Sequence, residues 1–374
     1  MRKISEEQKK TLLTRSKTGA FLTAFCVLLI IVGVFSDSRS SDNGGFISQL
    51  NEKLYPLLPI LMSVALVLIL TWIPFAVARE LDNCFTKFGS RRINFWIGLT
   101  MLLAALIPTI YMLVSIYLPY YNSDVNILWW NSIIFAFVQY AVPGLLLIPA
   151  YFILKKSNNF NKVNLFGYSF IIVLLPILLI NVFYLFFVRS FATVMVIVFL
   201  VSMTDTWAYI SGTIFGKHKL APIISPKKTW EGAIGGFLVA ISLALLLMFT
   251  FSIGESQFKL QTEFFGAQYQ SAGSAKWGPG ETIGWWMFTL AMFAVLSVYS
   301  MFSDLLFSVF KRKNKIKDYS NIFPGHGGLL DRIDSLAPTL VLYSAIMFIV
   351  GVCSTFINHT DTILTPAAAA ISGA

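Results

Sequence analysis

The chain alternates between long apolar blocks and short polar segments along most of its length. A helix needs about 20 mostly apolar residues to cross the hydrocarbon layer of a bilayer. Lipid offers the backbone no hydrogen-bond partner, so blocks of this length are expected to be helical. We expect an all-α integral membrane protein, a polytopic bundle of about nine transmembrane helices. The predicted helices cover about residues 19–35, 55–78, 93–119, 127–154, 165–188, 191–211, 233–253, 284–310 and 335–357.

Basic residues are distributed very unevenly among the polar segments. If the basic N-terminal segment 1–19 is cytoplasmic, the segments on that side hold 23 of the 28 Lys and Arg residues. Cytoplasmic loops are normally enriched in these residues, so we expect a cytoplasmic N-terminus and an external tail over 358–374. The first apolar block resembles a signal-peptide core, but no A-x-A cleavage site follows it, and we expect it to remain as a span.

The predicted spans divide the chain into two membrane regions. The N-terminal region, 20–189, has about five spans, and the C-terminal region, 190–357, has about four. Two cytoplasmic loops of the C-terminal region, 212–232 and 311–334, carry most of the polar chemistry. A soluble catalytic domain needs at least about 50 residues, and no polar segment is that long. Any active site must therefore be built from span ends and short loops at the cytoplasmic face of the cell membrane.

Composition narrows the class further. Hydrophobic residues make up 56% of the chain and charged residues only 12%, about half the charged share of an average soluble domain. This balance excludes a soluble enzyme and an intrinsically disordered chain. The net charge of +10 is explained by cytoplasmic loops that face anionic lipid, so we expect no nucleic-acid partner. The three cysteines form no CxxC motif or Cys/His cluster, which argues against zinc and a disulfide framework.

Two aspartates interrupt otherwise apolar spans near their predicted cytoplasmic ends. Burying the carboxylate of Asp205 or Asp304 in a bilayer costs at least about 2.5–3.5 kcal/mol. Each is therefore expected to face a cation or another polar partner. For Asp205, the alternative is a hydrogen bond to a neighbouring helix.

The loop after Asp205 contains a candidate phosphate site. Ser225 and Pro226 are typical of the N-cap and first position of a helix. Lys227, Lys228 and Thr229 would then lie in the first turn, where free backbone N–H groups and the positive helix end attract phosphate. The alternative is that the two lysines only anchor a span at the cytoplasmic side.

The second loop contains a glycine-rich turn. Pro324, Gly325, Gly327 and Gly328 indicate a tight turn with little side-chain bulk, whose backbone can approach phosphate oxygens. His326, within the turn, is open to three interpretations: a proton shuttle, a hydrogen-bond donor to phosphate, or an ordinary turn residue.

Asp331 and Asp334 follow this turn and share one face if the segment is helical. Carboxylates together with substrate phosphates are the ligands that Mg²⁺ prefers. The alternatives are an N-cap role for Asp334 and an ion pair between Asp331 and a loop lysine. With Asp205 and Asp304, these residues predict a cluster of four aspartates at one depth, which favours metal-assisted phosphoryl or nucleotidyl transfer. The basic residues expected around the cluster are Lys227, Lys228, Lys311, Arg312, Lys317 and Arg332.

The stretch from Ser308 to Asp334 resembles the phosphatidate cytidylyltransferase family, also called CDP-diacylglycerol synthases. It matches the family pattern S-x-x-K-R-x(4)-K-D-x-S-x(2)-F-P-x-H-G-G-x-x-D-R-x-D without a gap. The segment from Asp205 to Gly232 resembles the family as well, notably in Phe215-Gly216-Lys217 and in the run from Ser225 to Glu231-Gly232. One departure is Phe307, where family members often have glutamate in G-D-L-x-E-S.

The resemblance implies transfer of CMP from CTP to phosphatidate, giving CDP-diacylglycerol and pyrophosphate in phospholipid biosynthesis. CTP, phosphatidate and the bilayer are the implied partners, and Mg²⁺ is the implied cofactor; a second cation and a homodimer are left open. The implied catalytic residues are Lys311, Arg312, Asp331, Arg332 and Asp334, and the implied metal ligands are Asp205, Asp304, Asp331 and Asp334. The implied substrate-binding residues are Ser225, Lys227, Lys228, Thr229, Glu231, Lys317, Asp318, His326, Gly327 and Gly328.

Two other functions fit parts of the sequence. Another membrane phosphotransferase is one, but the D-G-x-x-A-R type motif expected of CDP-alcohol enzymes is absent from the sequence. A cation-coupled transporter using Asp205 and Asp304 is the other. It would predict inverted repeats, which we do not find, and it does not explain the Gly-His-Gly-Gly turn.

Overall fold

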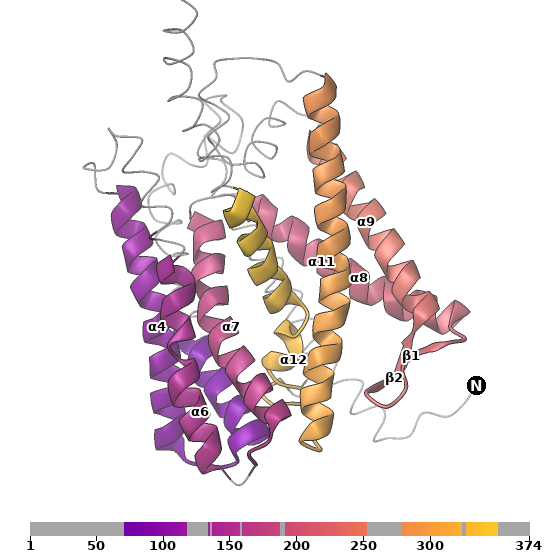
Figure 1. Ribbon diagram of the computed structural model, residues 1–374. Helices are drawn as coiled ribbons and strands as arrows, with labels where there is room; N and C mark the ends of the chain where they lie inside the picture. The colour runs from indigo at the N-terminus through magenta and orange to yellow at the C-terminus, as the bar shows by residue number, and fades with distance from the viewer. Residues whose placement is uncertain are drawn as a thin grey trace, which may run out of the picture.

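The computed structural model describes residues 71–117, 134, 137–157, 159–187, 191–252, 279–323 and 327–350. Most of these residues are helical, and Figure 1 shows the helices gathered into one bundle. Two shorter apolar helices accompany a set of long ones, at Trp230–Leu246 and Leu336–Val350. Within these described ranges, five helices are long and apolar enough to cross a membrane, namely Arg91–Tyr111, Phe137–Lys156, Lys162–Val182, Val194–Phe215 and Trp286–Lys313.

These seven apolar helices correspond to the last seven of the nine predicted blocks. The block at 55–78 is described only from residue 71, where it is helical. The block at 19–35 and the two terminal segments, 1–19 and 358–374, lie outside the described residues. The all-α membrane class therefore agrees with the structure, while the count of nine spans and the sides of the two termini stay predictions.

Helices from the first half of the described chain form one side of the bundle, on the left of Figure 1. There α7 (Lys162–Phe187) packs against both α4 (Arg91–Tyr117) and α6 (Leu147–Lys156). It is apolar all round, as expected for a helix enclosed by others. A helix over residues 71–81 leads into this group and ends in a π-helical turn, η2 (Asp82–Thr86).

The second half of the described chain forms the other side (Figure 1). It begins with α8 (Phe191–Phe215) and α9 (Trp230–Ser252), and a small β-hairpin connects the two helices. The long helix α11 (Pro279–Lys313) packs against both of them and against α7. After it come a loop, the short helix α12 (Leu330–Ile333) and a final helix over 336–350.

Small residues allow α9 to pack closely on α8. A Cβ atom at Gly232 would lie 2.6 Å from the carbonyl oxygen of Ala208, and one at Gly236 would lie 2.6 Å from that of Thr204. Glycines at such contacts let helix backbones approach closely where lipid supplies no hydrophobic driving force. This packing holds the second half of α8, which contains Asp205, beside the start of α9.

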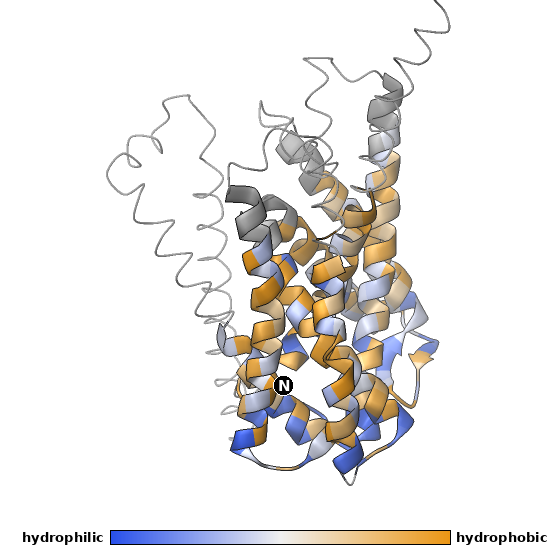
Figure 2. Ribbon diagram, turned by 60° about the vertical axis from the view of Figure 1, so that its left-hand side comes forward, coloured by the Kyte–Doolittle hydropathy of each residue, from blue (hydrophilic) through white to orange (hydrophobic). Residues whose placement is uncertain are grey.

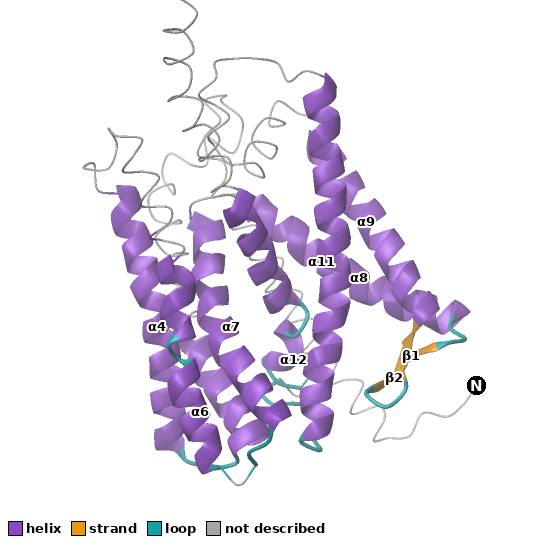
Figure 3. Ribbon diagram, viewed as in Figure 1, coloured by secondary structure: helices purple, strands orange, loops and turns teal. Residues whose placement is uncertain are grey.

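The prediction that Ser225 and Pro226 begin a helix is wrong. Residues 225–229 form strand β2 (Ser225–Thr229), which pairs antiparallel with β1 (Lys219–Ala221), as Figure 3 shows. The helix begins only at Trp230, where the hydroxyl of Thr229 accepts a hydrogen bond from the Gly232 N–H at 3.2 Å. Thr229 therefore has the capping role that the sequence suggested for Ser225. The pairing with β1 keeps the preceding four residues extended.

Polar residues gather at one end of the bundle. In Figure 2 the middle of the helices is mostly hydrophobic, whereas hydrophilic positions concentrate at the lower end and on the β1–β2 hairpin. Large apolar side chains such as Trp96, Phe137 and Phe152 are exposed along the helices. This distribution is typical of helices that face lipid along their length and water at their ends.

Candidate active site

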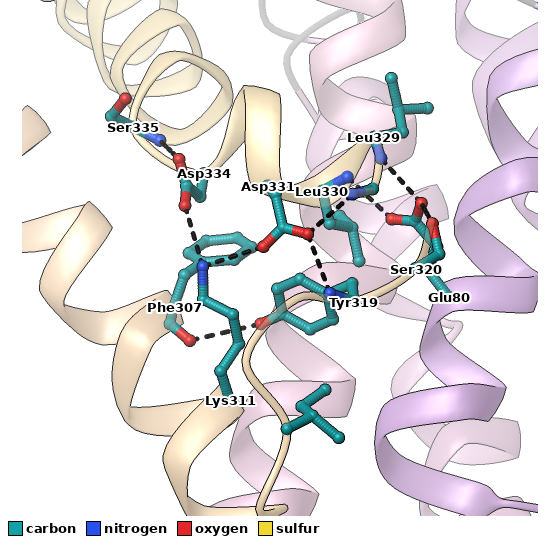
Figure 4. Close-up of polar contacts among 12 residues, drawn as sticks. Glu80, Phe307, Lys311, Tyr319, Ser320, Leu329, Leu330, Asp331, Asp334 and Ser335 are labelled. Carbon is teal, nitrogen blue, oxygen red and sulfur yellow. Dashed lines mark hydrogen bonds and ion pairs between the residues drawn. The ribbon is translucent and has the colours of Figure 1, made fainter. Parts of the chain in front are cut away.

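The ammonium group of Lys311 is the centre of a buried charged group near the end of α11. Its Nζ lies 3.0 Å from Oδ1 of Asp331 and 3.4 Å from Oδ2 of Asp334, as Figure 4 shows. The side chains are 12%, 5% and 12% exposed, respectively. The ion pair considered as an alternative for Asp331 is thus formed, and its buried position makes it costly to break.

Asp331 also organises the loop that contains the glycine turn. Its second oxygen, Oδ2, accepts hydrogen bonds from the backbone N–H groups of Tyr319 and Gly328, both at 2.8 Å. Gly327 has a φ of +85°, and a Cβ atom there would lie 2.9 Å from Asp331 Oδ2. Both the left-handed conformation and the close carboxylate therefore favour glycine at position 327.

Ser335 joins Asp334 to Asp205 on α8. Its hydroxyl donates to Oδ2 of Asp205 and its backbone N–H donates to Oδ1 of Asp334, both at 3.0 Å. Ser303 of α11 donates to the backbone oxygen of Asp334 at 2.5 Å. A chain of contacts thus runs from Asp205 through Asp334 and Lys311 to Asp331.

Asp304 lies in the same group, paired with a lysine of the hairpin. Oδ2 of Asp304 lies 2.5 Å from Nζ of Lys228, and the two side chains are 27% and 28% exposed. Burial first, and then the negative charge of Asp304, raise the pKa of Asp334 above its usual range, while Lys311 opposes the rise. Four carboxylates thus share two ammonium groups, and negative charge is in excess.

This excess charge fits a hard cation such as Mg²⁺, which takes oxygen ligands. Asp205, Asp304 and Asp334 are the better candidate ligands, because Asp331 already accepts three hydrogen bonds from protein groups, two of them from backbone N–H groups on Oδ2. Among the described residues, no three His, Cys, Asp or Glu side chains are arranged to hold a metal ion by themselves. Water and substrate phosphates would have to complete the coordination, as is usual for Mg²⁺.

Other candidate residues hold the hairpin in place. The Nε of Arg312 donates to the backbone oxygen of Ile224 at 3.3 Å, which ties the hairpin to α11. The carboxylate of Glu231 accepts from the backbone N–H groups of Lys217 and His218 at 3.1–3.2 Å and lies 2.6 Å from Nδ1 of His218. These contacts place Lys228 opposite Asp304.

The remaining predicted residues differ in how far they are exposed. Ser225 is half-buried in β2, and Gly327 and Gly328 are buried in the turn. His326 lies outside the described residues. Four of the predicted basic and acidic residues have exposed side chains, namely Lys227, Lys317, Asp318 and Arg332.

A carboxylate that the sequence analysis did not consider also contacts this loop. Glu80, near the end of the helix over 71–81, has no exposed surface. It accepts hydrogen bonds from the Ser320 hydroxyl at 2.6 Å and from the backbone N–H groups of Leu329 and Leu330 at 2.7 and 2.8 Å. Burial raises its pKa, although these hydrogen bonds act in the opposite direction. Its only sequence signal was an acidic residue two positions after the apolar block at 55–78.

Phe307, which departs from the family pattern, lies in an aromatic cluster. It is fully buried, with its ring centroid 6.0 Å from that of Phe310, 6.2 Å from that of Phe170 and 6.3 Å from that of Tyr319. A carboxylate at this place would be surrounded by apolar rings. The position is thus part of the packing beneath Lys311, not a further charge in the site.

Comparisons with known proteins give one consistent result. The model of the cytidylyltransferase family matches residues 54–350. Over 151 residues, 40% of this chain, the sequence is 36% identical to the phosphatidate cytidylyltransferase of Haemophilus influenzae, and over 147 residues, 39% of this chain, it is 37% identical to that of Rickettsia bellii. These alignments span 44% and 52% of the two relatives. A Mycoplasma pneumoniae protein, provisionally given the same name, is 29% identical over 322 residues, which are 78% of this chain and 75% of that protein.

Proposed function

Because the chain belongs to the cytidylyltransferase family, we propose that it transfers CMP from CTP to phosphatidate and so makes CDP-diacylglycerol and pyrophosphate. It is a CTP-using nucleotidyltransferase of phospholipid biosynthesis with helices apolar enough to cross a membrane. The observation that carries the proposal is the meeting of Asp205, Asp304 and Asp334, from separate helical segments, with Lys311 of α11 and Lys228 of the hairpin.

In this reaction a phosphate oxygen of phosphatidate attacks the α-phosphorus of CTP. A bond forms between that oxygen and the phosphorus, and the bond from the α-phosphorus to the bridging oxygen of the β-phosphate breaks, releasing pyrophosphate. A phosphate monoester is already anionic at neutral pH, so no strong base is needed. The main barrier is repulsion between two anions, which favours catalysis by positioning and charge stabilisation.

The lysines of the site are placed to reduce this repulsion. Lys228 is paired with Asp304, and Lys311 with Asp331 and Asp334. An entering phosphate would offer each ammonium group a further anionic partner without requiring it to move far. Arg312 and the exposed Lys227 lie on the same hairpin-to-α11 junction, where they can hold the outer phosphates.

Asp205, Asp304 and Asp334, with Asp331 beside them, would hold Mg²⁺ at this site. When bound, the ion would neutralise phosphate charge and orient the pyrophosphate leaving group. The protein's own contribution is the arrangement of these carboxylates by Ser335 and Ser303.

We place the site at the cytoplasmic face of the cell membrane. The support for this placement is the concentration of Lys and Arg in the loops that carry it. The polar end of the bundle in Figure 2 includes the hairpin. The acyl chains of phosphatidate would stay in the bilayer while its headgroup reaches the aspartates, which removes the need for a soluble domain.

The proposal is tested with the purified, detergent-solubilised chain, CTP labelled on the α-phosphate, phosphatidate and Mg²⁺. We expect labelled CDP-diacylglycerol and one pyrophosphate per product, and loss of both when the metal is chelated. Diacylglycerol in place of phosphatidate should give no product, because it lacks the attacking phosphate. Absence of any nucleotide-containing lipid would contradict the proposal, and cation-driven substrate uptake instead would favour a transporter.

A further inference from the structure

We propose that Glu80, from the first half of the chain, is a positioning residue for the reaction. In this view it fixes the loop before α12 so that Asp331 meets Lys311. The inference rests on the proposed function for its activity readout, and on contacts that are independent of that function for its structural readout.

The contacts of Glu80 span a very large distance in sequence. Its partners, Ser320, Leu329 and Leu330, are 240–250 residues further along the chain. Oε1 accepts from the Ser320 hydroxyl and the Leu329 N–H, and Oε2 accepts from the Leu330 N–H. Figure 4 shows the carboxylate reaching the loop from the helix on the right, on the side opposite Lys311. Both carboxylate oxygens of Glu80 therefore accept hydrogen bonds from the loop.

The two adjacent glycines of the loop reflect this arrangement. A Cβ atom at Gly328 would lie 2.5 Å from Oε1 of Glu80, whereas one at Gly327 would lie 2.9 Å from Oδ2 of Asp331. Each glycine thus leaves room for one carboxylate, and the turn is held between Glu80 and Asp331. The glycine pair that the sequence suggested for phosphate approach is also required by two carboxylates of the chain itself.

The link from Glu80 to the charged site is short. Leu330, whose N–H Glu80 holds, is bonded directly to Asp331, and Asp331 contacts Lys311 at 3.0 Å. A shift of Leu330 would move the Asp331 carboxylate by a similar amount. A small displacement of a charged group is expected to lower kcat strongly, because positioning supplies a large share of the rate enhancement in phosphoryl-type transfers.

Asp82 offers a matched control from the same part of the chain. It is 3% exposed and accepts from the Thr86 hydroxyl, the Phe88 and Gly89 N–H groups and the Asn94 amide at 2.5–3.1 Å. All these partners lie within twelve residues of Asp82. Asp82 therefore resembles Glu80 in burial and hydrogen bonding but does not contact the loop at 319–330.

The test compares Glu80→Gln with Asp82→Asn in the full-length protein. In Glu80→Gln, an amide N–H group replaces one oxygen, so at least one loop donor loses its acceptor. The loop would then leave the position in which Asp331 meets Lys311, so we expect kcat to fall by about 10-fold or more, which corresponds to about 1.4 kcal/mol in the activation barrier. We expect Asp82→Asn to lower the melting temperature as much while leaving kcat within about 2-fold, with activity measured well below both transitions.

A second readout needs no activity. Amide hydrogen exchange at Leu329 and Leu330 should become faster in Glu80→Gln and stay unchanged in Asp82→Asn. If Glu80→Gln fails to fold, Ser320→Ala removes one donor only, and we expect a smaller loss of kcat at an unchanged KM for CTP.

Three results would overturn the inference. The first is a Glu80→Gln protein with wild-type kcat and wild-type amide exchange. The second is an Asp82→Asn protein that loses as much kcat as Glu80→Gln does. The third applies if Glu80→Gln fails to fold, and is a folded Ser320→Ala protein with wild-type kcat. If the wild-type protein makes no CDP-lipid, the proposed function fails, while the exchange result still decides whether Glu80 holds the loop.

Discussion

Buried carboxylates occur in both halves of the described chain, but their partners differ. Glu80 and Asp82, in the first half, accept hydrogen bonds only from uncharged hydroxyl, amide and backbone N–H groups. In the second half, Asp304 pairs with Lys228, and Asp334 pairs with Lys311 while repelled by other carboxylates. Hydrogen bonds from uncharged donors fix the position of a buried carboxylate. An excess of buried negative charge destabilises the fold unless a cation binds beside it. The difference indicates that the first half supplies position and the second half supplies charge.

The largest effect is expected for Asp331→Asn, because Asp331 belongs to both classes of carboxylate. It accepts two backbone N–H groups and also pairs with Lys311. We expect turnover to fall by about 100-fold or more, as for loss of other preorganised charged groups. The melting temperature should fall too, because the variant also weakens the hydrogen bonds that hold the loop. Steady-state kcat beside helical content by circular dichroism checks this, and near-normal turnover would remove Asp331 from the site.

Gly328→Ala tests the positioning half of the comparison. The new methyl group would lie 2.5 Å from Oε1 of Glu80, and such overpacking typically costs about 1–3 kcal/mol. Gly144→Ala is the control, because a Cβ atom there meets nothing within 4 Å. We expect a clear drop in melting temperature and turnover for the first variant and none for the second. Equal behaviour of the two variants would argue against the close contact with Glu80.

The charged half predicts a dependence of stability on pH through Asp334. Burial and Asp304 raise its pKa in the folded state, above the value of about 3.9 in an unfolded chain. A raised pKa means that the folded protein binds the proton more tightly, so this contribution to stability is full at low pH and is lost as pH rises. The melting temperature of the wild type relative to Asp334→Asn should therefore fall between pH 4 and pH 8. A constant difference would contradict the excess of negative charge.

The smallest effect separates the two lysines of the hairpin. Lys228 contacts Asp304, whereas Lys227 is exposed. We expect Lys228→Ala to raise the KM for CTP by about 10-fold and Lys227→Ala by about 2–3-fold, because exposed charges are screened by salt. Measurement at two salt concentrations should reduce only the Lys227 effect. An unchanged CTP requirement in both variants would favour simple membrane anchoring.

Much of the fold could be predicted from the sequence because lipid imposes one structure on a long apolar block. Within the described part of the chain, apolar helices occur at seven predicted blocks, and the described end of an eighth, residues 71–78, is helical as well. The error at Ser225 arose because local capping signals ignore strand pairing, and the partner of β2 lies several residues earlier. Ser225 and Pro226 suit a helix start in isolation, but the β1–β2 hairpin delays the helix to Trp230.

The site was only partly predictable. Charges in apolar spans and the motif around Asp331 pointed to the residues that the structure brings together. The sequence could not show that one carboxylate oxygen of Asp331 accepts hydrogen bonds from two backbone N–H groups, since that depends on how the loop folds. Glu80 was missed because all its site contacts are made with residues at least 240 positions away.

The most direct test of the convergence of helices in one active site is the turnover of Asp205→Asn. Asp205 lies in α8, about 130 residues before Ser335, and its hydrogen bond with the Ser335 hydroxyl connects it to the site. Removing its charge should lower kcat for CDP-diacylglycerol formation by about 100-fold and raise the Mg²⁺ concentration needed for half-maximal rate, with helical content unchanged. Wild-type turnover and Mg²⁺ dependence in this variant would contradict the account.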